Sequence, residues 1–133
     1  MEQQVPSMAI ILLSEDIEKV HAGALVGSMA AMSGMEVNLF VTMNALKPFL
    51  KKSVENKDFK TGDVGKALIE KDAPSFDKLI REGREMGTLN VYGCALALDV
   101  MEWNKDDLID VFDDIIGVTK FLGMAQNGQV VTM

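Results

Sequence analysis

Five short apolar runs alternate with segments of helical character along this chain, and this alternation constrains the fold more than any other feature of the sequence. The first run, "MAIILL" at residues 8–13, is continuous, and the polar stretch "SEDIEK" follows it directly. Continuous apolar runs of this length are typical of parallel strands that are buried on both faces. Further strands are expected at residues 35–41, 88–93, 113–117 and 129–133.

Helical signals fill the segments between these runs. Apolar and small residues recur at helical spacing over residues 17–33, and Gly34 stands where a helix commonly ends in a left-handed conformation. Ser75 predicts the start and Gly87 the end of a helix over residues 76–86. Further helices are expected in "ALKPFLKKS", which contains Pro48, and in "VTKFLGMAQNG". Another short helix is expected from Asn104 to Phe112. The segment "CALALDVMEW" is apolar all round and therefore predicts a helix that is packed on several sides.

This order of elements predicts an α/β fold with three layers: a five-stranded, mostly parallel sheet with helices on both faces. Right-handed crossovers make such a fold flavodoxin-like or Rossmann-like. The chain has 133 residues, the usual size of one domain. We therefore expect a single domain over residues 1–133, in which residues 54–72 form a variable loop or a helical excursion.

Composition and charge exclude several classes of function. The net charge is −7 and the basic residues are interleaved with acids, which argues against nucleic-acid binding. No apolar run is long enough to span a membrane, and "MEQQVPS" lacks the positive start and apolar core of a secretion signal. The single cysteine rules out an intramolecular disulfide and is typical of a reducing compartment. We expect a cytoplasmic protein.

Candidate site residues follow from the fold class, because ligands of parallel sheets bind beyond the carboxyl ends of the strands. The predicted strand ends carry Ser14, Asp16, Thr42, Asn44, Gly93 and Cys94. Among these six residues, Cys94 is the one with reactive chemistry, and the other five are candidates for a pocket wall.

Cys94 has two interpretations. On residue type alone, a lone cysteine is a small buried hydrophobe. Its position at a strand end, in the first turn of a predicted helix, instead favours a thiolate, because free N–H groups and the positive end of the helix dipole lie there. Gly93 and Ala95 leave little side chain to cover it, but no Lys or Arg lies within eight residues and Asp99 follows on the same helix. Both interpretations stay open.

Other motifs predict little chemistry. His21, the only histidine, is expected to be a partly buried helix residue, although it could approach the strand ends as a base. "TGDVGKA" at residues 61–67 resembles a phosphate loop only superficially, because its glycines have the wrong spacing and Ala67 lacks the metal-binding hydroxyl. No metal-ligand spacing and no dinucleotide motif occur, so no cofactor is expected. Trp103 ends the helix of Cys94 and could cover the site or an interface.

The chain resembles the DsrE/DsrF-like family of intracellular sulfur-handling proteins. The stretch from "IILLSEDIEKV" to "NLFVTMNALKPFLKK" is similar to that family's first strand, small-residue helix and second strand. From "DAPSFDKLI" to the end, the chain is similar to the family's second half, where a cysteine is followed at five and seven positions by an acid and a methionine. Here these residues are Cys94, Asp99 and Met101.

The resemblance implies a homo-oligomer (trimer, tetramer or hexamer) and a cysteine that carries sulfur as a persulfide or thiosulfonate. Only Cys94 takes that role. Implied partners are sulfur donor and acceptor proteins, either rhodanese-like or small sulfur carriers. Two alternatives remain: a non-catalytic module for small-ligand binding or assembly, in which Cys94 packs in the core, and a thiol that responds to peroxide.

Overall fold

The computed structural model describes residues 5–133, so the first four residues of "MEQQVPS" lie outside the described part. Its five strands form one sheet in the order β4-β3-β2-β1-β5, and all neighbours are parallel. The predicted α/β fold class is confirmed, although the strand order differs from that of flavodoxin because β5 returns to pair with β1. The strands are β1 (Ser7–Leu12), β2 (Glu36–Val41), β3 (Thr88–Cys94), β4 (Asp114–Ile116) and β5 (Gln129–Thr132).

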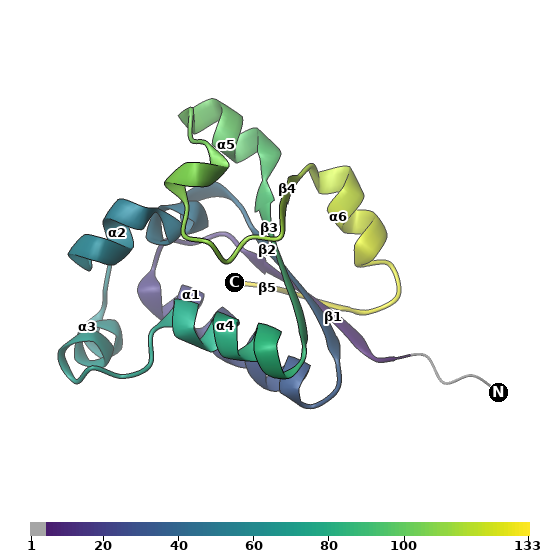
Figure 1. Ribbon diagram of the computed structural model, residues 1–133, viewed down its shortest axis with the longest axis horizontal. Helices are drawn as coiled ribbons and strands as arrows, with labels where there is room; N and C mark the ends of the chain where they lie inside the picture. Colours follow the sequence, from purple (N-terminus) through teal and green to yellow (C-terminus); the bar gives the residue numbers. More distant parts are fainter. Residues whose placement is uncertain (1–4) are drawn as a thin grey trace.

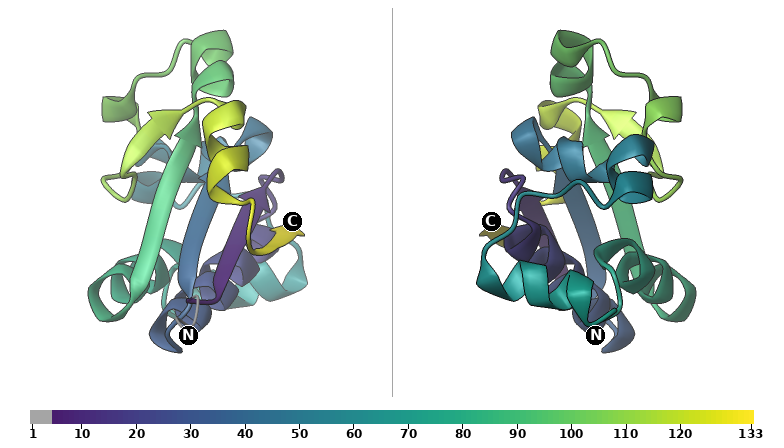
Figure 2. Two further views of the ribbon diagram at one scale, coloured as in Figure 1. Left: turned by 90° about the vertical axis from the view of Figure 1, so that its right-hand side faces the viewer. Right: turned by 90° about the vertical axis from the view of Figure 1, so that its left-hand side faces the viewer.

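Helices cover the two faces of the sheet unequally. Helices α1 (Ile17–Met32) and α4 (Phe76–Met86) lie side by side on one face, and α6 (Val118–Met124) lies on the other, as Figures 1 and 2 show. Phe121 of α6 stacks on Phe40 of β2 with ring centroids 4.6 Å apart. No helix among residues 5–133 is long and apolar enough to cross a membrane.

The crossing of α1 and α4 depends on small residues. A Cβ atom placed on Gly83 of α4 would lie 2.9 Å from the side chains of both Leu89 and Ser28, so only glycine allows this approach. At the far end of α1, Gly34 has a φ of 97°, which confirms the predicted left-handed helix end. Gly83 thus explains how closely α4 packs on α1 and on β3.

The segment between β2 and β3 is more helical than the sequence suggested. Pro48 lies in a 3₁₀ helix, η1 (Met43–Phe49), which is followed by α2 (Lys51–Asn56). Residues 54–72 hold the end of α2 and a further helix, α3 (Asp63–Glu70). Ser75 precedes α4 as predicted, but its hydroxyl donates to Asp77 instead of capping the helix.

Two predictions after β3 are wrong. Helix α5 (Ala95–Met101) is not packed on several sides: it stands at the top of Figure 1 and buries only Ala97 and Leu98. The predicted helix from Asn104 to Phe112 is a single 3₁₀ turn, η2 (Lys105–Asp107), followed by chain that is not helical: Leu108 forms an isolated bridge with Leu50, and residues 110–111 form a turn. The helix does not continue because the amide of Ile109 donates to the carbonyl of Phe49, 2.8 Å away.

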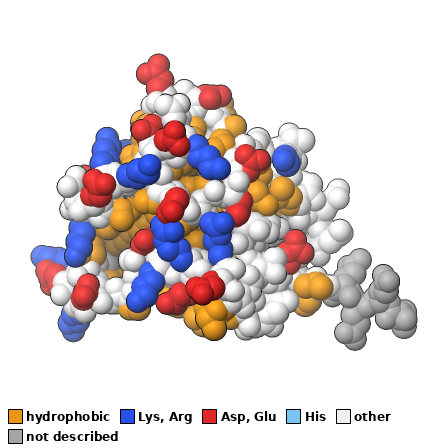
Figure 3. Space-filling view, viewed as in Figure 1, with side chains coloured by type: hydrophobic (Ala, Val, Ile, Leu, Met, Phe, Trp, Pro, Cys, Tyr) orange, Lys and Arg blue, Asp and Glu red, His pale blue; other side chains and the backbone are white. Residues whose placement is uncertain are grey.

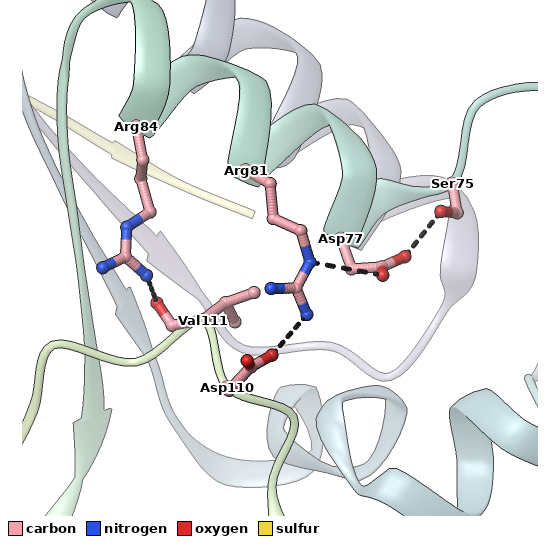
Figure 4. Close-up of polar contacts among 6 residues, drawn as sticks. All are labelled: Ser75, Asp77, Arg81, Arg84, Asp110 and Val111. Carbon is pink, nitrogen blue, oxygen red and sulfur yellow. Dashed lines mark hydrogen bonds and ion pairs between the residues drawn. The ribbon is translucent and has the colours of Figure 1, made fainter.

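Arginines of α4 hold this non-helical segment against the helical layer. Arg81 contacts Asp110, and Arg84 donates to the carbonyl of Val111, as Figure 4 shows. Arg84 also donates to Asp113, at 2.9 Å. The connection from β3 to β4 therefore returns along the face of α4, opposite to α6.

Candidate functional site

The carboxyl ends of β3 and β4 mark the point where the chain changes sides of the sheet. The connection that leaves β3 returns on the α4 face, held by Arg81 and Arg84, whereas the connection that leaves β4 forms α6 on the opposite face. In parallel sheets, ligands and reacting groups usually lie in the crevice beyond the carboxyl ends of two adjacent strands whose connections leave on opposite faces. Cys94 ends β3, and its register partner Ile116 ends β4.

Cys94 lies at this crevice but is not open to solvent. It is both the last residue of β3 and the N-cap of α5, with extended backbone angles. Its exposed fraction is 3%, and it is a free thiol. The thiol therefore has the predicted position in the fold, and any reaction requires that α5 or the neighbouring chain move.

Two of the predicted pocket residues lie beside Cys94. Val41 pairs with Gly93, so Thr42 follows β2 next to the cysteine. Thr42 is buried, and its amide donates to the carbonyl of Leu12 at 3.0 Å. Gly93 does not serve to uncover Cys94: a Cβ there would lie 2.7 Å from Ile115, so this glycine makes room for β4.

The other three predicted pocket residues do not gather at the cysteine. Ser14 and Asp16 follow β1, which is separated from β3 by β2. The Ser14 hydroxyl accepts a hydrogen bond from the amide of Asp16, and the Asp16 carboxylate pairs with Lys60 at 3.4 Å. Asn44 lies exposed in η1. These residues share the carboxyl edge of the sheet with Cys94, but they do not form one pocket with it.

Exposed apolar residues near the strand ends were not predicted. Met43 follows β2 with a φ of 52° and is 52% exposed. Leu96, Val100 and Met101 of α5 are also exposed. A left-handed methionine gives no signal in sequence, because this conformation is normally supplied by glycine or asparagine.

The glycine-rich stretch "TGDVGKA" does bind an anion, but the anion belongs to the chain itself. The carboxylate of Glu18, in the first turn of α1, accepts hydrogen bonds from the amides of Gly62 and Gly65 at 2.7 and 2.9 Å. A Cβ on either glycine would lie within 3 Å of another side chain. The two glycines thus let α1 cap the start of α3. The two glycines were a visible signal in the sequence, but their partner Glu18, 44 residues earlier, was not.

This cap predicts an acid-sensitive α3. The amide of Gly65, foremost, and those of Glu18 and Gly62 lower the pKa of the Glu18 carboxyl below its ordinary 4.5. Because the pKa of Glu18 is lower in the folded state, the stabilisation that its carboxylate gives to the docking of α3 is complete above about pH 4.5. This stabilisation is lost as the pH falls through the pKa that Glu18 has in the folded protein. We expect Glu18→Gln to weaken the docking of α3 by about 1 kcal/mol at pH 7 and to reduce its dependence on acid.

Amide hydrogen exchange of α3 measures both effects. Glu70→Gln, on the exposed side of the same helix, is the matched control and should leave exchange unchanged. Equal protection of α3 in wild type and Glu18→Gln at pH 7 would contradict the cap.

His21 and Trp103 lie away from the cysteine in two separate cavities. His21 lines a cavity between α1, α3 and α4, and its partial burial lowers the pKa of its imidazole. Trp103 lines another beside Leu50 and Asp107. Cys94 lines neither cavity. Within residues 5–133, no three His, Cys, Asp or Glu side chains gather in a way that could hold a metal ion.

Comparison with known proteins agrees with this fold. No curated protein matches the chain. Two solved structures have the same fold: YchN from E. coli, with a TM-score of 0.62 and 13% identity, and a protein of unknown function, MTH1491, from Methanobacterium thermoautotrophicum, with a TM-score of 0.60 and 11% identity. Each comparison covers 98% of this chain and 100% of the other. A family model for DsrE/DsrF/DrsH-like proteins matches residues 43–133, which include Cys94 and the strands β3, β4 and β5. The chain therefore belongs to the DsrE/DsrF/DrsH-like family.

Proposed function

We propose that this protein carries sulfane sulfur on Cys94, as a persulfide or thiosulfonate, and passes it to the thiol of a partner protein. Family membership supports a role in sulfur relay. The observation that carries the proposal is the place of the only cysteine: it ends β3 at the point where the connections of two adjacent strands leave on opposite faces. In this proposal the protein works in the cytoplasm, as a homo-oligomer, with donor and acceptor proteins as partners.

The transfer needs no external oxidant. With thiosulfate, the Cys94 thiolate attacks the outer sulfur, the S–S bond of thiosulfate breaks, and sulfite leaves with the electron pair. Cys94 then holds a persulfide. An acceptor thiolate attacks its outer sulfur, the new S–S bond forms, and the Cys94 thiolate is released. The N–H groups in the first turn of α5 have no acceptor within the helix and start directly after Cys94, where they can stabilise these anions.

Access to the thiol is part of the proposal, because Cys94 is almost fully buried. Helix α5 follows the cysteine directly and is held by only two buried side chains, Ala97 and Leu98. Its exposed residues Leu96, Val100 and Met101 offer an apolar contact to a partner. We propose that a partner docks on these residues and moves α5 aside.

Mass spectrometry of the intact protein tests the proposal. After incubation with thiosulfate, tetrathionate or polysulfide, wild type should gain a sulfur-bearing adduct that reductant removes. Cys94→Ser should gain none, because the chain has no other thiol. An adduct on Cys94→Ser would contradict the proposed site.

A second candidate function follows from the burial of Cys94. If the cysteine only packs in the core, the protein is a binding or assembly module without sulfur chemistry. In that case, wild type stays unmodified by every sulfur donor, and an alkylating reagent labels Cys94 only after denaturation. A peroxide-responsive thiol gives a third result, since it forms sulfenic acid with peroxide and gains no sulfur.

A further inference from the structure

A cavity of about 410 Å³ lies on the helical face of the molecule, away from Cys94. The start of α1 and the start of α4 form two of its walls. One side of α3, Val54 of α2 and the loops on either side of α3 line the rest. Figure 3 shows this region as a hollow with hydrophobic side chains inside it, bounded by the elements that Figure 1 labels α2, α3 and α4. Its volume is within the range of small-molecule sites in proteins.

The interior of this cavity is apolar. Ile17 and Phe76 are buried in its floor, and Phe59 meets Phe76 edge to face with ring centroids 5.8 Å apart. Leu68 and Ile69 of α3 are only partly buried, although they line the cavity. Apolar side chains that remain partly wet inside a concave site gain free energy when an apolar group displaces the water.

Two unpaired lysines offer this cavity a place for an anion. Lys57 and Lys78 line it and are exposed, and within residues 5–133 neither forms an ion pair. Of the two lining carboxylates, Asp77 accepts a hydrogen bond from Ser75 and lies 3.8 Å from Arg81, which also pairs with Asp110, and Asp72 is exposed.

His21 adds a polar group to the wall. Its imidazole is partly buried, and this burial lowers its pKa. It is a neutral donor and acceptor at pH 7, and it forms no hydrogen bond to another described side chain. The cavity thus combines an apolar interior, one free imidazole and two ammonium groups.

We propose that this cavity binds a small carboxylate, with its apolar body against Phe59 and Phe76 and its charged end towards Lys57 and Lys78. No residue of this site takes part in the proposed sulfur transfer. The site is held closed on one side by α3, which Glu18 fastens to α1.

Titration of the full-length protein with hexanoate, followed by NMR, tests the proposal. Hexanoate should shift the ring signals of His21, which are unambiguous because the chain has one histidine, together with the amide signals of Leu68, Ile69 and Phe76. Hexylamine, which has the same chain and the opposite charge, should bind more weakly. Equal binding of hexylamine, or shifts confined to the exposed residues of α5, would overturn the proposal.

Matched variants separate charge from shape. The double variant Lys57→Gln/Lys78→Gln should weaken hexanoate about fivefold, which is about 1 kcal/mol, and leave hexanol unaffected. Lys66→Gln, at an exposed position of α3 that does not line the cavity, should change the affinity for neither hexanoate nor hexanol. Ala73→Phe should fill the cavity and abolish the binding of both ligands, and the amide spectrum of this variant checks that it is folded. Unchanged hexanoate affinity in the double variant would refute the role of the two lysines.

The test is independent of sulfur transfer. Cys94→Ser should bind hexanoate like wild type, because Cys94 does not line the cavity. Equal hexanoate binding by Cys94→Ser and wild type therefore supports this inference, whatever the outcome of the sulfur-loading experiment.

Discussion

Leu98→Ala is expected to speed the alkylation of Cys94 in the native protein at least about tenfold. Leu98 is 4% exposed and, with Ala97, forms the buried side of α5. Loss of a buried leucine side chain commonly costs about 2–5 kcal/mol, and every 1.4 kcal/mol taken from the free energy of opening α5 raises the open population about tenfold. Because Cys94 is inaccessible in the closed form, the labelling rate follows that population.

Two leucine variants control this experiment. Leu96→Ala changes a residue of the same helix that is 63% exposed, and should leave the labelling rate unchanged. Leu79→Ala removes a buried side chain from α4 and lowers global stability without loosening α5. If Leu79→Ala accelerates labelling as much as Leu98→Ala, Cys94 reacts only through global unfolding and the proposed motion of α5 is wrong.

Asp113→Ala is expected to lower the free energy of unfolding by about 2 kcal/mol and the Tm by roughly 5–10 °C. One oxygen of this carboxylate accepts from the amide of Val91 at 2.7 Å, and the other accepts from Arg84 at 2.9 Å. Val91 is fully buried, so alanine leaves its N–H group without a partner and away from water. Thermal unfolding followed by circular dichroism measures the change.

Asp110→Ala is the matched control, because Asp110 also pairs with an arginine of α4 but is solvent-exposed. Its Tm should stay close to that of wild type. Equal effects of the two substitutions would show that the ion pairs, and not the hydrogen bond to Val91, account for the stability.

The sheet was predictable because each strand is a contiguous signal. In the run "MAIILL" the neighbours Ala9 and Ile10, which point to opposite faces of the sheet, are both buried, so local composition alone reveals the strand. The strand order was not predictable, since β5 pairs with β1 through backbone hydrogen bonds that leave no mark in the sequence. Gly34 was predictable as a helix end because its φ is positive.

The errors occurred where tertiary contacts override local preference. Residues after Asn104 have a helical pattern, but the amide of Ile109 donates to the carbonyl of Phe49 and Arg84 donates to the carbonyl of Val111, so no helix forms beyond η2. The sequence "CALALDVMEW" predicts a helix packed on several sides because apolar residues usually imply burial, whereas α5 exposes Val100.

The candidate site was predictable only in part. The position of Cys94 at a strand end follows from strand prediction alone, and the structure has it there. Its burial, and the separation of Ser14 and Asp16 from it, depend on the strand order and on the contact between Asp16 and Lys60. The cap formed by Glu18 joins segments 44 residues apart in sequence, a distance at which spacing rules carry no information.

The attachment of α3 also bears on how this family can vary. Residues 57–75 contact the body of the domain through the Glu18 cap, the Asp16–Lys60 pair and the walls of the cavity, and contribute no strand to the sheet. Lengthening such a segment costs little, since each doubling of a loop adds only about 0.6 kcal/mol of closure entropy. Insertions and deletions can therefore accumulate here and reshape the cavity while the sheet that positions Cys94 stays the same.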